Sequence, residues 1–172
     1  MAPENPTKMA LLAALRASGD EAVATLRALP PESLARVCYA GGWNGREVVA
    51  HLAAIEWTYP RLIDLARQAT AHQTGQQGAP GDTEAAPSLS GGIDGYNARQ
   101  VAKRAGIPID DLIDEFARNR AATIGAVEAI DEPLLAVAIR SAGGIEGPLA
   151  DVLRWVAVDH VLGHLHDITS GE

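Results

Sequence analysis

Apolar residues recur every three to four positions in four stretches of the chain, at about 6–28, 44–70, 110–130 and from 148 to near the C-terminus. This is the spacing of helices that bury one face, and each stretch makes a helix about 30 Å long. A helix with a single apolar stripe is stable only when other helices cover that stripe. The sequence therefore predicts an all-α fold, a four-helix bundle, and its 172 residues predict a single domain over residues 1–172.

Local signals place the ends and breaks of these helices. Asn44 and Glu47 form an N-x-x-E pair that predicts a capping box at the start of the second helix. Pro60 falls inside the second apolar stripe and is expected to kink or divide that helix, because proline lacks an N–H and crowds the preceding turn. Gly19 is expected to interrupt the first helix, with Asp20 capping a restarted one.

The connection between the second and third helices is long. Residues 72–95 are rich in glycine, proline, serine and threonine and predict an irregular loop, followed by a short helix over 96–104. Antiparallel neighbours need only about 2–8 connecting residues. We therefore expect a long crossover that returns along the bundle, so that helices two and three run parallel in up-down-down-up order. Residues 134–139 predict either a short strand or a buried loop.

Composition excludes several classes of protein. Lys and Arg number 14 and Asp and Glu 22, a net charge of −8, and the basic residues are scattered, so a nucleic-acid-binding protein is not expected. The single cysteine, Cys38, excludes an internal disulfide and a cysteine-based zinc site, and it is expected to be buried. No apolar run reaches the roughly 18–20 residues of a membrane span, and the N-terminus lacks a secretion-signal pattern. A cytoplasmic protein is expected.

Three histidines occupy helix positions where leucine or valine is usual. His160 and His164 are one turn apart and project from one strip of the fourth helix, the spacing by which one helix supplies two ligands to one ion. His51 lies about 10 Å along the second helix, which matches their depth of roughly 7–14 Å if the helices are antiparallel neighbours. This predicts a three-histidine site for a divalent cation with open coordination positions. The alternative is three separate core histidines satisfied by hydrogen bonds.

Two further residues are candidates for a catalytic role. Asp167 returns to the face of His160 and is expected either to orient a ligand or hold a water, or simply to be solvated at the helix end. Arg120 lies on the apolar face of the third helix, where it presents a cation to an anionic substrate or, alternatively, reaches the rim or pairs with a carboxylate. The remaining expectations are a solvated Glu56, a surface His166, a loop-borne His72 that is no ligand, and core positions for Trp43 and Trp155.

Three segments carry a resemblance to a known family. They are Gly42-Trp43-Asn44 through His51-Leu52, Tyr96-Asn97, and Asp159-His160 through Asp167-Ile168. Together they resemble the DinB-like (YfiT-like) metalloenzyme family and the related N-terminal domain of mycothiol-dependent maleylpyruvate isomerases. The resemblance covers essentially the whole chain.

That resemblance implies an up-down-down-up bundle whose metal ligands are His51, His160 and His164. The ion would be divalent, with zinc or nickel first and iron, manganese or copper as alternatives. It also implies a small-molecule substrate, a low-molecular-weight thiol partner and a homodimer. The chain departs from the isomerases at His160, where they tend to carry a carboxylate, and their additional C-terminal domain is not expected within this chain.

Three functions follow as hypotheses. The first is a divalent-metal-dependent enzyme, a thiol-dependent S-transferase or a hydrolase-like protein, with mycothiol as a thiol suited to a bacterial chain rich in alanine and arginine. The second is a non-catalytic, stress-related bundle that only holds a metal. The third is a structural helical module whose histidines are ordinary core residues.

Overall fold

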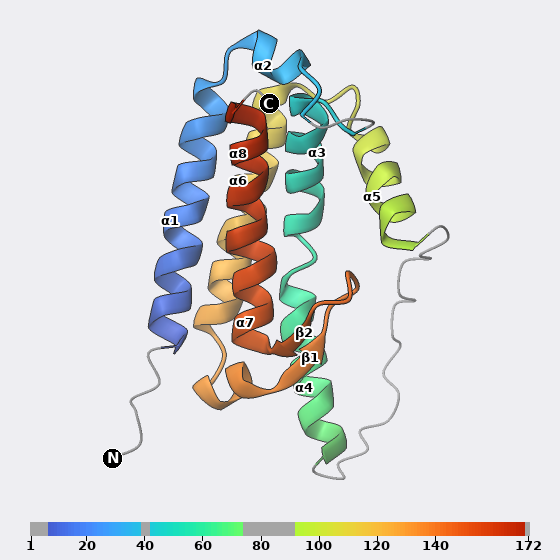
Figure 1. Ribbon diagram of the computed structural model, residues 1–172. Helices are drawn as coiled ribbons and strands as arrows, with labels where there is room; N and C mark the ends of the chain where they lie inside the picture. Colours follow the sequence, from blue (N-terminus) through green and yellow to red (C-terminus); the bar gives the residue numbers. More distant parts are fainter. Residues whose placement is uncertain (1–6, 39–41, 74–91, 171–172) are drawn as a thin grey trace.

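Helices make up most of the computed structural model, which describes residues 7–38, 42–73 and 92–170. In Figure 1, α1 ascends, α3, α4 and α6 descend, and α7 and α8 ascend again to the C-terminus. Helix α6 packs against both α1 and α3, and α8 also contacts α1 and α3. The predicted all-α fold is confirmed. The main helices are α1 (Thr7–Ala28), α3 (Gly45–Glu56), α4 (Pro60–Gln73), α5 (Gly92–Lys103), α6 (Ile109–Glu128), α7 (Leu149–Arg154) and α8 (His160–Ser170).

Short elements fill the ends of the helical core. The segment predicted as a strand or a buried loop contains both a 3₁₀ turn, η1 (Glu132–Ala136), and a strand, β1 (Ala138–Arg140). Strand β1 pairs antiparallel with β2 (Glu146–Pro148), and α2 (Pro31–Ala35) follows α1. Within the described residues, no helix is both long and apolar enough to span a membrane.

The predicted start and division of the second helix are both present. The Asn44 side chain accepts a hydrogen bond from the Glu47 amide at 2.9 Å, and the Glu47 carboxylate accepts one from the Asn44 amide at 2.9 Å. The helix then stops at Glu56, and α4 begins at Pro60. The division leaves three residues outside both helices, and Tyr59 is one of them.

The connection after α4 differs from the prediction at both ends. Helix α4 extends to Gln73 and α5 already begins at Gly92, so the loop expected over 72–95 is helical where its ends are described. Its central part, 74–91, lies outside the described residues. His72 accordingly lies on a helix rather than in a loop, and it is exposed.

Helix α1 runs without a break through Gly19, contrary to the predicted interruption. Gly19 is buried, and a Cβ atom at this position would lie 3.0 Å from Cγ of Arg120. Glycine is therefore required here by the close approach of a neighbouring side chain rather than by a helix end.

Substituting two helical glycines separates these roles. Gly125→Ala, with no atom within 4 Å of the added Cβ, should stabilise the protein by about 0.5–1 kcal/mol through helix propensity. Gly19→Ala should instead destabilise it by about 1 kcal/mol, because Arg120 is held by several hydrogen bonds and cannot move aside. Urea unfolding of both variants measures the difference, and equal stabilisation by both would contradict the close-contact explanation.

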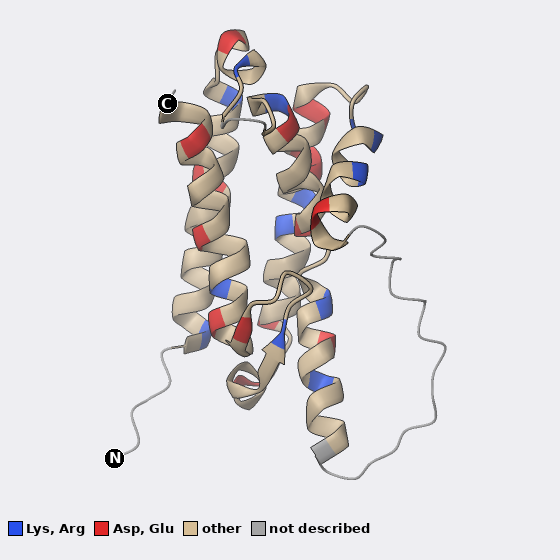
Figure 2. Cartoon of the chain, turned by 45° about the vertical axis from the view of Figure 1, so that its right-hand side comes forward, with Lys and Arg blue, Asp and Glu red and all other residues tan. Residues whose placement is uncertain are grey.

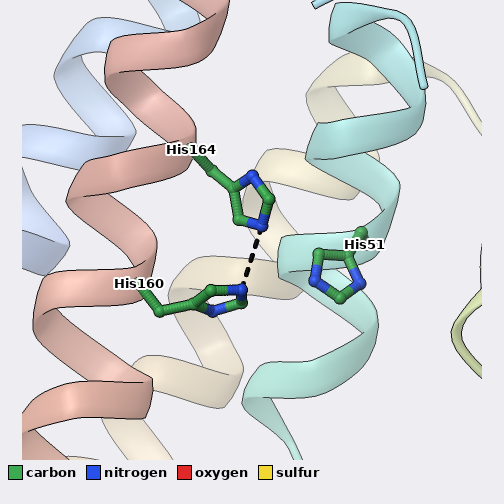
Figure 3. Close-up of side chains that lie close together, drawn as sticks. All are labelled: His51, His160 and His164. Atoms are coloured by element: carbon green, nitrogen blue, oxygen red, sulfur yellow. Dashed lines mark hydrogen bonds between the residues drawn. The ribbon is translucent and has the colours of Figure 1, made fainter. Parts of the chain in front are cut away.

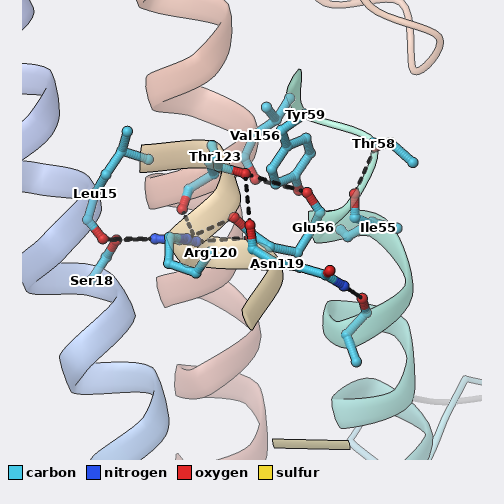
Figure 4. A network of polar contacts seen from close by, with 12 residues as sticks. Leu15, Ser18, Ile55, Glu56, Thr58, Tyr59, Asn119, Arg120, Thr123 and Val156 are labelled. Carbon is cyan, nitrogen blue, oxygen red and sulfur yellow. Dashed lines mark hydrogen bonds and ion pairs between the residues drawn. The ribbon is translucent and has the colours of Figure 1, made fainter. Parts of the chain in front are cut away.

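A buried polar layer separates two apolar clusters of the core. One cluster contains Leu15 and Tyr59 and the other contains Leu52 and Phe116. Between them, the Arg120 guanidinium forms two hydrogen bonds with the Glu56 carboxylate, at 2.7 and 3.0 Å (Figure 4). It also donates to the Leu15 carbonyl, the Ser18 hydroxyl and the Ala157 carbonyl.

Glu56 is therefore not solvated as predicted. Its side chain is completely buried because α6 places a cation directly opposite it. Burial raises the pKa of the Glu56 carboxyl, while its hydrogen bonds to Arg120 act in the opposite direction. A bidentate arginine partner is the arrangement that makes a buried carboxylate tolerable.

Basic and acidic positions are interspersed along the helices (Figure 2). Several form ion pairs between helices, such as Arg27 of α1 with Asp114 of α6 at 2.7 Å. Both side chains of this pair are about half exposed, so such contacts contribute little stability.

The last helical stretch contains a π turn, η2 (Trp155–Asp159), between α7 and α8. Along α7, η2 and α8, one buried residue recurs at every fourth position: Leu149, Leu153, Ala157, Val161 and Leu165. In a straight α-helix this stripe would rotate by about 160° around the axis over sixteen residues. The extra residue in the π turn reverses part of that rotation and keeps the stripe facing the core.

Candidate metal centre

Three histidines from two helices converge on one point (Figure 3). His51 projects from α3, and His160 and His164 project from successive turns of α8. One ring nitrogen from each lies within 4.8 Å of the others, and the Nε2 atoms of His160 and His164 are 3.0 Å apart. The predicted juxtaposition of these three rings is therefore present in the fold.

Each of the three imidazoles is held in the neutral form. Burial lowers the pKa of His51 to about 3, with further lowering by the neighbouring His164 and His160. Burial and His160 lower the pKa of His164 to about 4, while Asp167 opposes the shift. Burial also lowers the pKa of His160, although a hydrogen bond to the backbone of Val156 acts against it. Neutral imidazole is the form that binds a metal ion.

The ring nitrogens themselves fit a cation. Nδ1 of His51 is buried and has no hydrogen-bond partner, and Nε2 of His164 faces Nε2 of His160. Two imidazole nitrogens bound to one tetrahedral zinc ion at about 2.0–2.1 Å lie about 3.3–3.4 Å apart, and the Nε2 atoms of His160 and His164, 3.0 Å apart, are close to this spacing. An all-imidazole set suits zinc, nickel, copper or iron better than magnesium or calcium.

A pocket of about 620 Å³ opens beside the cluster, and His51 and His160 form part of its wall. Most of its lining is apolar, from α3, α4, α5 and the β1–β2 loop. Asn97 of α5 also lines it, and the side-chain Oδ1 of Asn97 is buried without a hydrogen-bond partner. A pocket with apolar walls and a few polar groups is the usual form of a small-molecule site.

A second, smaller hollow of about 220 Å³ also lies beside the cluster. It is lined by His160, His164, Trp155 and Asp167. Trp155 was expected in the core, but its exposed fraction is 47% and its ring stacks on His160 with centroids 5.9 Å apart. The π turn places Trp155 on the outer face of the helix, next to the cluster rather than beneath it.

The candidate catalytic residues lie in different places. Asp167 is near the cluster, with a carboxylate oxygen 3.7 Å from Nδ1 of His164 and a side chain 41% exposed. Arg120 pairs with Glu56 in the core and does not line the pocket, so of the two alternatives for this residue the carboxylate pairing is the one observed. His166 is exposed, as predicted, and Cys38 is buried.

Sequence reasoning missed three residues around the cluster. Trp43 was placed in the core, but its ring lies 4.8 Å from the His51 ring and is only partly buried. Tyr59 and Asn97 both line the pocket. The Tyr-Pro step at the break in the second helix was the available signal for Tyr59, because a residue outside both helices can turn toward a neighbouring segment.

The lowered pKa values predict how stability depends on pH in the metal-free protein. Below pH 6.5 the histidines of the unfolded chain take up protons, whereas His51 and His164 stay neutral in the fold until pH falls to about 3 and 4. The unfolding free energy should therefore fall as pH decreases from about 6.5 toward 4, by about 1.4 kcal/mol per pH unit for each proton. Urea titrations of the metal-free proteins from pH 5 to 7.5 should show a shallower slope for His51→Leu than for the wild type, and equal slopes would contradict the lowered pKa of His51.

The fold and the site together define a class of protein, namely a helical protein in which three neutral imidazoles lie beside an open pocket. A sequence model of the mycothiol maleylpyruvate isomerase N-terminal domain matches residues 15–169. The chain belongs to this family, which confirms the resemblance identified from its motifs.

Solved structures show the same fold. The mycothiol-dependent maleylpyruvate isomerase superposes with a TM-score of 0.68 at 17% identity, covering 94% of this chain and 60% of that one. A histidine-to-alanine mutant of that isomerase gives a TM-score of 0.65 at 16% identity, with the same coverage. The chain thus spans about three-fifths of the length of these structures. No curated protein sequence matches the chain.

Proposed function

We propose that this chain is a metal-dependent enzyme in which His51, His160 and His164 hold one divalent cation. The observation that carries the proposal is the convergence of three neutral imidazoles, one buried and two partly buried, from two helices beside an open pocket. Zinc and nickel are the metals we favour for this ligand set, with iron, manganese and copper as alternatives. The proposal includes the predicted up-down-down-up four-helix topology, which brings the two ligand-bearing helices together as antiparallel neighbours.

We further propose that the reaction is thiol-dependent S-transfer or a related hydrolysis, with mycothiol as the thiol suggested by the family. A bound divalent cation would lower the pKa of a thiol or water and supply a nucleophile at neutral pH. The apolar walls of the pocket would keep water from the substrate, and Asn97 Oδ1 would accept a hydrogen bond from it. Asp167 would orient the His164 ring from the smaller hollow.

Metal content tests the site. Protein purified without a histidine tag should contain about one divalent ion per chain, and added Zn²⁺ or Ni²⁺ should raise the melting temperature of the metal-free form, since a ligand bound only by the folded state stabilises it. Absence of metal together with no stabilisation by either ion would overturn the proposal.

Turnover separates an enzyme from a protein that only holds a metal. The open pocket favours the enzyme, because a purely metal-holding site has no need of a cavity beside it. Rates with mycothiol, bacillithiol or glutathione and a simple electrophile should fall at least 100-fold in His164→Ala. His166→Ala, an exposed histidine on the same helix, is the matched control and should retain full activity. Equal rates for both variants would point to the non-catalytic alternative.

A further inference from the structure

The π turn η2 leaves a backbone carbonyl without its usual helical partner. In an α-helix the amide of His160 would donate to the carbonyl of Val156, four residues earlier. Here that amide donates instead to the carbonyl of Trp155, five residues earlier. The Val156 carbonyl therefore has no hydrogen bond from the His160 amide, and it lies one turn before His160, the first residue of α8.

The released carbonyl receives a hydrogen bond from a distant side chain. The Tyr59 hydroxyl donates to it at 2.7 Å from the break between α3 and α4 (Figure 4). Tyr59 is 5% exposed, and its burial raises the pKa of the phenol well above its usual value, so the hydroxyl keeps the proton that it donates. The next carbonyl, that of Ala157, accepts from Arg120 at 2.5 Å. The Tyr59 hydroxyl thus supplies a partner for the carbonyl that the π turn releases.

We propose that Tyr59 is a positioning residue for His160, because its hydroxyl holds the Val156 carbonyl in the π-turn arrangement that brings the His160 ring against His51 and His164. The His160 ring also hydrogen-bonds to the backbone of Val156, so this carbonyl connects Tyr59 with His160 directly. Without the Tyr59 hydroxyl, the carbonyl can shift toward the His160 amide, which converts the π turn toward an α-helical one. That conversion rotates the start of α8 relative to α7 and carries the His160 ring away from its present place. A backbone carbonyl held in this way acts on the ligand indirectly, as outer groups around metal-binding histidines commonly do.

The variant Tyr59→Phe tests the inference, since it keeps the buried ring and removes only the hydroxyl. Thr169→Val is the matched control, because it removes a hydroxyl that donates to a carbonyl of the same helix, Leu165 at 2.9 Å, away from the π turn. NMR of the metal-free proteins then reports the His160 ring resonances and the amides of residues 155–160. We expect both sets to shift in Tyr59→Phe and to stay unchanged in Thr169→Val, with the exposed His72 ring of α4 as an internal reference.

Zinc titration gives the second readout. If the three histidines bind zinc, Tyr59→Phe should bind it about 10–100-fold more weakly and Thr169→Val within about twofold of the wild type. The inference concerns the site of the proposed function, but the two fail differently. Unchanged His160 and π-turn resonances in Tyr59→Phe would overturn the positioning role while leaving the metal site intact. A wild-type protein that binds no zinc or nickel would overturn the proposed function, and the metal-free NMR comparison would still decide the role of Tyr59.

Discussion

Replacing His51 with leucine should reduce zinc affinity at least 100-fold while leaving the fold intact. The substitution removes one of the three candidate ligands from a position that is 4% exposed, flanked on α3 by the buried side chains of Val48 and Leu52 and in contact with the Trp43 ring and the other two histidines. Leucine fits such surroundings, and it also removes a buried ring nitrogen that has no hydrogen-bond partner. The metal-free variant should therefore be as stable as the wild type or slightly more so. Isothermal titration with Zn²⁺ and urea unfolding of the metal-free protein measure the two effects.

The comparison with His166→Ala makes this result specific. His166 lies on α8 between the two candidate ligands and the C-terminus but faces solvent, so its loss should change zinc affinity less than twofold. A His51→Leu protein that is less stable without metal and still binds zinc normally would instead identify His51 as a core histidine. That outcome would exclude His51 as a ligand of the bound zinc.

Replacing Arg120 with methionine should destabilise the protein by about 3–5 kcal/mol. Methionine fills much of the same space but leaves the Glu56 carboxylate, which is completely buried, without its charged partner. Removing one member of a buried ion pair leaves the other as an unpaired charge in the core, and its desolvation energy is then no longer compensated. The Ala157 carbonyl and the Leu15 carbonyl lose a donor as well. Urea unfolding at pH 7 measures the loss.

Two further variants show whether the loss comes from the buried charge. Arg16→Met removes an exposed partner of Glu128, both side chains being about half exposed, and should cost less than about 1 kcal/mol. The double variant Glu56→Gln/Arg120→Met should recover part of the loss, because no charge then remains in the core. Equal costs for Arg120→Met and Arg16→Met would show that the buried layer contributes no more than a surface pair.

Local sequence signals were sufficient for the helical elements. Apolar spacing and the Asn44–Glu47 capping box located the helices, and Pro60 predicted the division between α3 and α4. The errors arose where distant residues decide the local conformation. Gly19 was predicted to break the helix, but it instead makes room for the Arg120 side chain. Glu56 was predicted to be solvated, but Arg120 of α6 pairs with it in the core.

In the candidate site, too, local spacing predicted some features and contacts between distant residues decided the others. The positions of His51, His160 and His164 on apolar stripes, with two of them one turn apart, predicted that their rings would meet. Their surroundings did not follow from spacing. Trp155 is exposed because the π turn shifts the phase of the helix before His160, and a shift of this kind depends on donors such as Tyr59, ninety-seven residues away from its acceptor.

By itself, the sequence determined which segments are helical, which face of each is apolar and which imidazoles lie on those faces, because these properties depend on residues three or four positions apart. Only the tertiary structure decided which buried polar groups are partnered, where the pocket opens and how the last helix is wound. Those features depend on hydrogen bonds and contacts between residues far apart in the chain, and the local spacing of residues does not predict them.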